Sequence, residues 1–366
     1  MGRIKIIFFV RDMGRCAGAE RVLAIIANGL SKRGYSVIIL NREGMGPAFF
    51  PLDGSVKVYW LDDSKGPWNS IKLMSRSKTM RMRIFLKHEK PDFLIDVDIV
   101  NSLVSFFMKD LVAGMRWYAW ECMTCFYHAD SHSNYNFRRK LAQILIGKSA
   151  DRLLVLTDAD KDAYRNNKRL KCEVSFIYNP LPYKEKFLKR VEKKIILAVG
   201  RLVNEKGFDL LIKSWKALEQ GHLDWIVLIA GEGEERKKLE EHAGNAGLRN
   251  IKFIGNKKNI EEFYAEAAFF VLPSRSEPFG MVLIEAMHFS LPVISYDCES
   301  GPGEIITDGQ DGFLIPPGDT KLFADKMELL INDKRMRRSM GENAQRSVRR
   351  FEQDLILDQW EELFKG

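Results

Sequence analysis

The sequence has few cysteines and no long apolar segment. Its 366 residues contain 5 cysteines, an odd number, and no secretory signal, so we expect reduced thiols in the cytoplasm rather than disulfides. The apolar run Ile4 to Val10 is too short for a signal-peptide core or a membrane span, and Arg11 and Asp12 follow it directly. The start of the chain lacks the Ser or Thr of a myristoylation signal. We therefore expect a soluble globular protein.

The sequence also lacks the motifs of nucleic-acid-binding proteins and of nicotinamide dehydrogenases. No RNA-binding signature, zinc-finger spacing or interleaving of aromatic and basic residues is present, so we expect no nucleic-acid partner. The loop Arg11 to Gly18 does not match the G-x-G-x-x-G fingerprint, which disfavours a nicotinamide dehydrogenase. It would still place backbone N–H groups beside an anion, and the alternative is a tight turn without a ligand. Cys122 and Cys125 form a lone C-x-x-C pair, typical of two ordinary thiols, with zinc or redox chemistry as the alternative.

Positive charge is concentrated in the first half of the chain. Residues 1–185 hold 30 Lys and Arg against 19 Asp and Glu, a balance of +11, whereas residues 186–366 carry a balance of −3. A basic half implies an anionic partner, such as phosphates or an anionic membrane surface. The stretch Trp68 to Lys90 is interpreted as a basic helix, and Arg138-Arg139-Lys140 adds a second cluster. Both a membrane-surface helix and a core helix with a solvated basic face fit Trp68 to Lys90.

Short apolar segments alternate with helical patterns, which is typical of parallel, doubly wound sheets. The segments expected to be strands are Ile4–Val10, Val37–Leu40, Val56–Trp60, Phe93–Ile95, Trp117–Ala119, Leu153–Leu156, Val174–Ile177, Ile195–Val199, Trp225–Ala230, Ile251–Ile254, Phe269–Leu272, Pro292–Tyr296 and Phe313–Ile315. Asn179-Pro180-Leu181-Pro182 and the charged stretch Lys184 to Lys194 interrupt the rhythm and predict a linker.

The sequence therefore predicts an α/β protein with two Rossmann-like, doubly wound domains. We expect these domains in residues 1–184 and 185–350, facing each other across a cleft at the carboxyl ends of their sheets, where open α/β sheets bind ligands. Residues 351–366 are expected to form a helix that packs back on the first domain.

Two glutamates in the stretch Ser274 to Tyr296 are candidates for ligand binding. Glu285 is the only formally charged residue between Phe279 and Tyr296, and it falls in an expected helix from about Gly280 to Phe289. Glu277 lies eight residues earlier, before the helix. A carboxylate in so apolar a helix needs a partner. Ligand hydroxyls, as in sugars and riboses, are one solution, and a structural ion pair with a distant Arg or Lys is the other.

A loop with two cations follows the strand Ile195–Val199. Arg201 and Lys206 are five residues apart in a loop bounded by Gly200 and Gly207, and a planar guanidinium with a point charge suits a diphosphate. The alternative is a solvated loop paired with Glu205. Two later strands also end in glycine, at Gly231 and Gly255, which would let a flat ligand approach the backbone.

These motifs carry a resemblance to a known family. The stretches GRLVNEKGFD, IAGEGEE and FIG, the E-x7-E pattern from Glu277 to Glu285, and GPGEIITDGQDGFLIPPGD resemble the retaining glycosyltransferases of family 4, which have the GT-B fold. The opening AGAERVLAIIANGLSKRGYSV and the stretches LTDADKDAY and IYNPLP fit the same family, so the resemblance covers essentially the whole chain.

The resemblance implies roles for individual residues. Arg201 and Lys206 would hold the donor diphosphate, Glu277 would contact the donor sugar, and Glu285 would accept hydrogen bonds from the ribose hydroxyls. Many family members carry a histidine after the fifth strand, where this chain has Glu121; Glu121 is a candidate for positioning a substrate, and a structural role is the alternative. The remaining donor contacts implied by the resemblance are Gly18, Gly200, Gly231, Phe253, Gly255, Phe279, Gly280 and Met281, and the nearest histidines to Glu121 are His128 and His132.

The implied reaction is the transfer of a sugar with retained configuration from a nucleotide-sugar donor, with UDP as the favoured nucleotide. Neither an enzyme nucleophile nor a metal cofactor is expected. The acceptor would be a glycan or a polyprenyl- or lipid-linked saccharide of a bacterial surface polysaccharide or glycolipid. The basic first half suggests the hypothesis of a peripheral contact with the anionic inner face of the cytoplasmic membrane.

Two alternatives remain. Asp96 and Asp98 follow an apolar strand as a D-x-D motif, the metal signature of the other glycosyltransferase fold, but a single metal-dependent domain leaves the second α/β repeat unexplained. A non-catalytic scaffold that binds a sugar nucleotide is the other alternative, and the presence of both cations and both glutamates disfavours it.

Overall fold

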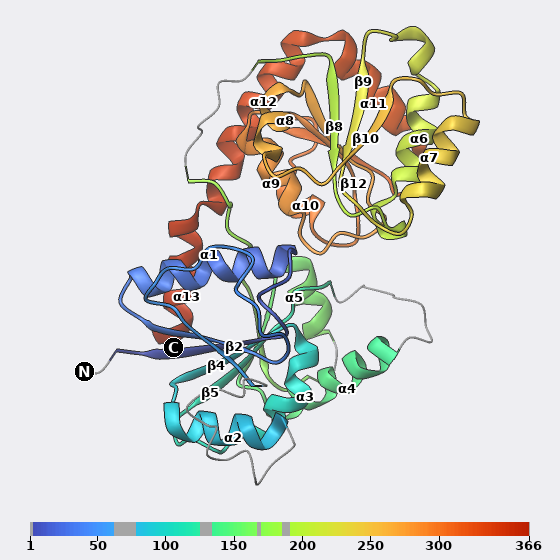
Figure 1. Cartoon of the computed structure of the whole chain (residues 1–366). Coiled ribbons are helices and arrows are strands. Elements are labelled where there is room, and N and C mark those ends of the chain that lie inside the picture. The colour runs from blue at the N-terminus through green and yellow to red at the C-terminus, as the bar shows by residue number, and fades with distance from the viewer. Residues whose placement is uncertain (1–2, 62–77, 125–133, 167–169, 185–190, 366) are drawn as a thin grey trace. The chain divides into compact units, whose positions relative to one another are not determined.

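The computed structural model describes residues 3–61, 78–124, 134–166, 170–184 and 191–365 (Figure 1). The chain divides into two compact units, one of residues 1–182 with 353–366 and one of residues 183–352, here called the N-terminal and C-terminal units. The predicted domain ranges, 1–184, 185–350 and 351–366, differ from these units by two residues at each boundary.

The N-terminal unit is built on a parallel sheet with the strand order β3-β2-β1-β4-β5-β6-β7. Its strands are β1 (Lys5–Val10), β2 (Ser36–Asn41), β3 (Lys57–Trp60), β4 (Phe93–Val97), β5 (Arg116–Trp120), β6 (Arg152–Val155) and β7 (Glu173–Phe176). The central strands β1 and β4 are buried along nearly their whole length, which explains why their sequences are continuously apolar rather than alternating.

Helices cover both faces of this sheet (Figure 1). They are α1 (Gly18–Lys32), α2 (Lys78–Glu89), α3 (Ser102–Ser105), α4 (Asn134–Ser149), α5 (Asp158–Arg165) and α13 (Gln353–Lys365), with short 3₁₀ turns at η2 (Ile99–Asn101) and η3 (Phe106–Met108). Helices α2 and α4 bury Met82, Phe85 and Ile146 in a core with Trp117 of β5.

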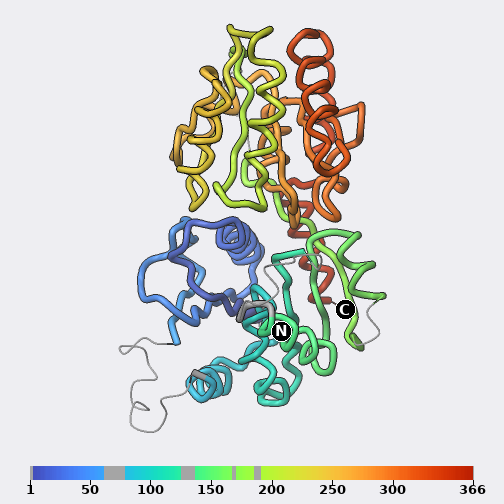
Figure 2. Tube along the Cα trace, turned by 90° about the vertical axis from the view of Figure 1, so that its right-hand side faces the viewer, coloured from blue at the N-terminus to red at the C-terminus, as the bar shows by residue number. Residues whose placement is uncertain are grey.

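The last helix, α13, belongs to the N-terminal unit although it ends the chain (Figures 1 and 2). The ring of Trp360 lies 5.9 Å from that of Phe8 and 5.1 Å from that of Trp120, between centroids. A Cβ atom at Gly29 would lie 2.3 Å from Leu357 Cδ1, so the glycine lets α13 approach α1 closely.

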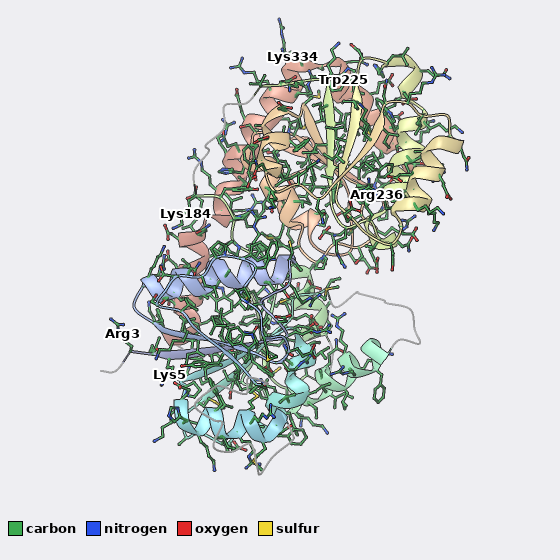
Figure 3. The ribbon with its side chains drawn as sticks, in the orientation of Figure 1. Arg3, Lys5, Lys184, Trp225, Arg236 and Lys334 are labelled. Atoms are coloured by element: carbon green, nitrogen blue, oxygen red, sulfur yellow. The ribbon has the colours of Figure 1, made fainter. Side chains whose placement is uncertain are left out.

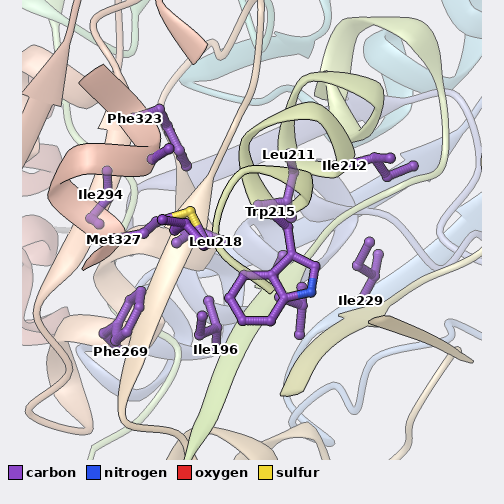
Figure 4. Close-up of a cluster of buried hydrophobic side chains, with 14 of the residues drawn as sticks. Ile196, Leu211, Ile212, Trp215, Leu218, Ile229, Phe269, Ile294, Phe323 and Met327 are labelled. Carbon is purple, nitrogen blue, oxygen red and sulfur yellow. The ribbon is translucent and has the colours of Figure 1, made fainter. Parts of the chain in front are cut away.

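The C-terminal unit contains a second parallel sheet with the strand order β10-β9-β8-β11-β12-β13. Its strands are β8 (Ile195–Val199), β9 (Ile226–Ala230), β10 (Ile251–Gly255), β11 (Phe269–Leu272), β12 (Val293–Tyr296) and β13 (Gly312–Ile315). Its helices are α6 (Phe208–Lys216), α7 (Arg236–Asn245), α8 (Ile260–Glu266), α9 (Met281–His288), α10 (Pro302–Ile305), α11 (Thr320–Asn332) and α12 (Lys334–Ser347), with 3₁₀ turns at η4 (Asn204–Lys206), η5 (Glu219–Gly221) and η6 (Val348–Phe351). The core on one face of the sheet gathers around Trp215, Phe269 and Met327 (Figure 4).

Every segment predicted to be a strand is a strand in the structure, and the doubly wound α/β fold class is confirmed. The predicted basic helix is described only in part, because α2 begins at Lys78 and residues 68–77 lie outside the described residues. Among the described residues, we find no helix with the length and apolar character that a membrane crossing requires.

Candidate functional site

The candidate site lies where the C-terminal sheet changes winding direction. Strands β8 and β11 are neighbours, but the chain leaves β8 towards β9 and leaves β11 towards β12, on the opposite side of the sheet. Open α/β sheets bind ligands at the carboxyl ends of strands at such a switch point. The loop after β8 carries Arg201 and Lys206, and the loop after β11 carries Glu277.

Lys206 and Glu277 form an ion pair across these two loops. The Nζ atom of Lys206 lies 2.6 Å from Glu277 Oε2, and the Ser274 hydroxyl donates to the same oxygen at 3.3 Å. Their side chains are only 16% and 9% exposed. Both donors use Oε2, which leaves Oε1 without a hydrogen bond to the described residues. The sequence analysis offered an ion pair with a distant Arg or Lys as one role for Glu277 and Glu285. Glu277 makes such a pair, and its partner Lys206 is itself a candidate site residue.

Arg201 differs from Lys206 in its surroundings. Its side chain is exposed, and within the described ranges no hydrogen bond or ion pair engages its guanidinium. The planar fork of donors is therefore available for an external anion.

The two loops are joined by further contacts that the sequence did not predict. The Arg275 guanidinium makes a bidentate pair with Asp209, at 2.8 and 2.6 Å, and its backbone N–H donates to the Glu205 carbonyl at 2.8 Å. A Cβ atom at Gly207, whose φ is +63°, would lie 2.0 Å from the Pro273 carbonyl oxygen. Arg275 lies two residues before Glu277, and this charge next to a candidate site residue was the only sign of it in the sequence. Its partner, Asp209, is 66 residues away and could not be found from local sequence.

Helix α9 starts at the same end of the sheet. Gly280 has a φ of +105°, and no side chain caps the helix at Met281. Ser300 donates to the Glu277 carbonyl at 3.3 Å, and a Cβ atom at Gly301 would lie 2.7 Å from the Phe279 carbonyl. The carbonyls of this turn thus pack against residues 300–301, while the positive end of α9 lacks a side-chain cap and can face an anion.

Glu285 is buried within α9. The hydroxyl of Tyr264, on α8, donates to Glu285 Oε2 at 3.2 Å, and Tyr264 stacks on Phe289 with 5.6 Å between ring centroids. The sequence analysis did not single out Tyr264, because a tyrosine in a helical segment carries no local sign of its partner.

The glycines at the strand ends pack against one another. A Cβ atom at Gly231, whose φ is +143°, would lie 1.9 Å from the Gly200 carbonyl oxygen, and the Gly231 N–H donates to the Gly255 carbonyl at 3.0 Å. Contacts within the chain therefore already require glycine at 231. The half-buried Phe253 accepts a hydrogen bond from Arg236 at its carbonyl (Figure 3 labels Arg236 near the start of α7).

In the N-terminal unit, Gly18 is the first residue of α1 and is exposed. A Cβ atom there would meet nothing within 4 Å, and no side chain caps the helix. Glu20, in the same turn, is buried; burial raises its carboxyl pKa, and its Oε2 has no hydrogen-bond partner among the described residues. The sequence analysis missed Glu20, although an acidic residue in a helix's first turn was a visible signal.

Glu121 occupies a fully buried network. Its carboxylate accepts from the Arg139 guanidinium at 2.8 Å and from the Tyr164 hydroxyl at 3.1 Å, and burial raises its pKa to about 7. This geometry is that of the structural alternative, and a direct contact with a sugar would require the network to open. The catalytic role of Glu121 remains a prediction. Cys125, His128 and His132 lie outside the described residues.

The D-x-D motif does not form an open metal site. Asp96 is fully buried and accepts hydrogen bonds from the Ser102 and Ser105 hydroxyls and the Trp117 indole, at 2.5 to 2.7 Å. Asp98 caps η2 by accepting from the Val100 N–H at 2.9 Å. The single metal-dependent domain that this alternative requires is contradicted by the two α/β units. Among the described residues, no group of three or more His, Cys, Asp or Glu side chains is placed to hold a metal ion.

Two Rossmann-like units in series, with a cation-bearing loop at the switch point of the second, define a glycosyltransferase of the GT-B class. The Glycosyltransferase Family 4 model matches residues 17–184, and the Glycosyl transferases group 1 model matches residues 182–347. A relative in Haemophilus influenzae, an uncharacterized glycosyltransferase, is 30% identical over 366 residues, covering 97% of this chain and 98% of its own. The chain belongs to this family of glycosyltransferases.

Two further comparisons extend the match. A Campylobacter jejuni protein is 28% identical over 98% of this chain and 97% of its own; it is an α-1,4-N-acetyl-D-galactosaminyltransferase for a saccharide linked to diphospho-undecaprenol. A crystal structure of a Staphylococcus aureus TarM variant with UDP, α-GlcNAc-glycerol and fondaparinux superposes with a TM-score of 0.82 over 99% of this chain and 100% of that one, at 15% identity. At that identity the likeness concerns the fold.

Proposed function

We propose that the protein is a retaining hexosyltransferase that uses a nucleotide-sugar donor, with UDP as the nucleotide. Its acceptor is a glycan or lipid-linked saccharide in the synthesis of a bacterial surface polysaccharide such as lipopolysaccharide. The Campylobacter jejuni relative, which acts on a saccharide linked to diphospho-undecaprenol, supports this acceptor class, and the UDP in the TarM structure supports the nucleotide.

The observation that carries the proposal is the Lys206–Glu277 pair beside the exposed Arg201. An ammonium group has three donors, so Lys206 can hold Glu277 and a phosphate oxygen together. Arg201 can bind the diphosphate with its planar fork. The first turn of α9 adds N–H groups and a positive helix end, which supports a diphosphate at this place.

The glutamates suit the sugar and the ribose. Lys206 and Ser274 fix the Glu277 carboxylate through Oε2, which leaves Oε1 to accept from a donor-sugar hydroxyl. Tyr264 orients Glu285, whose carboxylate suits the ribose hydroxyls.

The two cations act on charge that grows on the diphosphate as the glycosidic bond breaks. The acceptor hydroxyl attacks the anomeric carbon from the side that the diphosphate leaves. The new C–O bond forms as the bond from the anomeric carbon to the diphosphate oxygen breaks, and the departing diphosphate takes the hydroxyl proton, so no enzyme nucleophile forms a covalent intermediate. Charge stabilisation that strengthens in the transition state raises turnover more than ground-state affinity. Because Arg201 and Lys206 supply the positive charge that balances the leaving diphosphate, we propose that the reaction needs no metal ion. The reaction takes place in the cytoplasm, at the inner face of the membrane.

The proposal is tested by calorimetric binding of UDP, GDP and ADP in EDTA. We expect metal-free binding of UDP, strongly weakened in Glu285→Ala and moderately weakened in Tyr264→Phe, which keeps the carboxylate but removes its hydrogen bond. Exposed Glu241→Ala, on α7, is the matched control. Failure of all three nucleotides to bind, or equal binding by wild type and Glu285→Ala, would contradict the donor site.

Turnover separates the enzyme from a non-catalytic scaffold. With a UDP-sugar and a lipid-linked acceptor, we expect product in EDTA with the anomeric configuration of the donor, read by NMR. Nucleotide binding without turnover on any acceptor would favour the scaffold, and an inverted anomer would contradict retention.

A further inference from the structure

Helix α4 exposes a stripe of large apolar side chains. Phe137, Leu141 and Ile144 are 71%, 39% and 38% exposed. Their spacing of four and three residues places them on one face of the helix. The opposite face buries Ala142 and Ile146 in the core of the N-terminal unit. Helix α4 therefore carries apolar side chains both towards the core and towards solvent.

The exposure is concentrated in one layer of the molecule. Half of the exposed large hydrophobic side chains found in the described ranges lie on α2, η3 and α4: Met80, Phe107, Phe137, Leu141 and Ile144. These elements lie on the same side of the N-terminal sheet, because Met82, Met108 and Ile146 share one core with Trp117 (Figure 1). We call these five side chains the apolar face.

Cations border the apolar face. Helix α4 has four basic residues and no acidic one, and Arg138, Lys140 and Lys148 are exposed. Arg139 is instead buried and pairs with Glu121, so only Arg138 and Lys140 of the basic cluster Arg138-Arg139-Lys140 are exposed. Helix α2 likewise has more basic than acidic residues, and its one carboxylate, Glu89, pairs with Lys5.

We propose that the apolar face and its cations form a docking surface for an anionic lipid bilayer. Exposed apolar side chains that gather on one face and are bordered by polar residues mark interaction surfaces. A lipid interface accommodates both parts of this one, because rings and aliphatic chains enter the acyl boundary while Arg and Lys meet anionic headgroups. The proposal rests on the proposed function for its purpose, which is to bring the enzyme to a lipid-linked acceptor.

The test is sedimentation of the full chain with vesicles, without donor or acceptor. We expect binding to phosphatidylcholine vesicles that contain phosphatidylglycerol at low salt, and much weaker binding to phosphatidylcholine alone. Each cation near an anionic surface contributes roughly fivefold in affinity. The triple variant Arg138→Gln/Lys140→Gln/Lys148→Gln should therefore bind at least about a hundredfold more weakly.

A second variant isolates the apolar contribution. Phe137→Ser/Leu141→Ser/Ile144→Ser should lose binding to anionic vesicles even at low salt, whereas Leu355→Ser, an equally exposed apolar residue on α13, should bind like wild type. Thermal unfolding of each variant, compared with wild type, reports whether the N-terminal unit that carries the substitutions is still folded. A wild type that does not sediment with anionic vesicles, or an equal loss in Leu355→Ser, would overturn the proposal.

The same experiments distinguish membrane docking from self-association and from a failure of the proposed function. A concentration-dependent dimer that the apolar triple variant disperses, with no vesicle binding, would assign the face to a second copy of the chain and overturn membrane docking. Vesicle binding by a protein that binds no nucleotide would leave docking intact and contradict the proposed function.

Discussion

The Nζ atom of Lys206 lies 2.6 Å from Oε2 of Glu277, although 71 residues separate them in the chain. The Arg275–Asp209 pair and the close approach of Gly207 to Pro273 hold the same two loops together. The site is thus braced before any ligand binds, which is what transition-state stabilisation by fixed charges requires.

Replacing the two cations separately should distinguish catalysis from stability. We expect Arg201→Ala and Lys206→Ala each to reduce kcat by roughly 10²–10³-fold, by analogy with the loss of an oxyanion donor. Arg201 is exposed, so its variant should keep the wild-type melting temperature. Lys206→Ala leaves the buried Glu277 without its cation and should cost about 1–3 kcal/mol of stability.

Lys216→Ala, at an exposed position on α6, is the control for the loss of a positive charge. Wild-type turnover in Arg201→Ala or Lys206→Ala would remove these residues from the proposed mechanism. An equal loss of stability in both would contradict the difference in their surroundings.

Gly18 offers a test of the first-domain contact with the donor. A Cβ atom at this position meets nothing within 4 Å, so Gly18→Ala should fold normally, and alanine is the better helix former. If the donor phosphate passes close to this backbone, the methyl group should lower kcat/KM by about tenfold or more, which corresponds to one lost close contact. Gly54→Ala, another glycine with open surroundings, should behave like wild type. Unchanged kinetics in Gly18→Ala would place the donor elsewhere.

Asp96 predicts a pH dependence of stability. Burial raises its pKa from 3.8 to about 6, although hydrogen bonds from Ser105, Ser102 and Trp117 oppose the shift. The folded protein therefore holds this proton more tightly than the unfolded chain. The contribution of the Asp96 carboxyl group to the free energy of unfolding is fully present below about pH 4. It is lost as the pH rises through about 6, by up to about 3 kcal/mol.

The amide of Asp96→Asn does not titrate, so this variant should not lose stability between pH 4 and pH 7 as wild type does. Its free energy of unfolding minus that of wild type, measured in urea, should therefore be larger at pH 7 than at pH 4. The exposed Asp110→Asn should follow wild type at both pH values. A difference between Asp96→Asn and wild type that does not change with pH would show that the carboxyl group does not titrate in this range.

Much of the fold was visible in the sequence because its signals are local. Continuous apolar runs such as Ile195–Val199 are typical of strands covered on both faces, and the helix expected from about Gly280 to Phe289 is α9 in the structure. Arg201, Lys206, Glu277 and Glu285 were all singled out because charged residues beside glycine or within apolar helices are locally conspicuous.

The sequence by itself determined the strand and helix segments, the two-unit α/β class and the family. Only the tertiary structure decided which charges meet. It paired Glu277 with Lys206 and Arg275 with Asp209, turned Arg139 inward to Glu121, and left Phe137 in solvent beside Arg138. The physical reason is that strand and helix signals depend on neighbours within a few residues. Ion pairs and burial depend instead on contacts between segments that the chain brings together only when the sheets form.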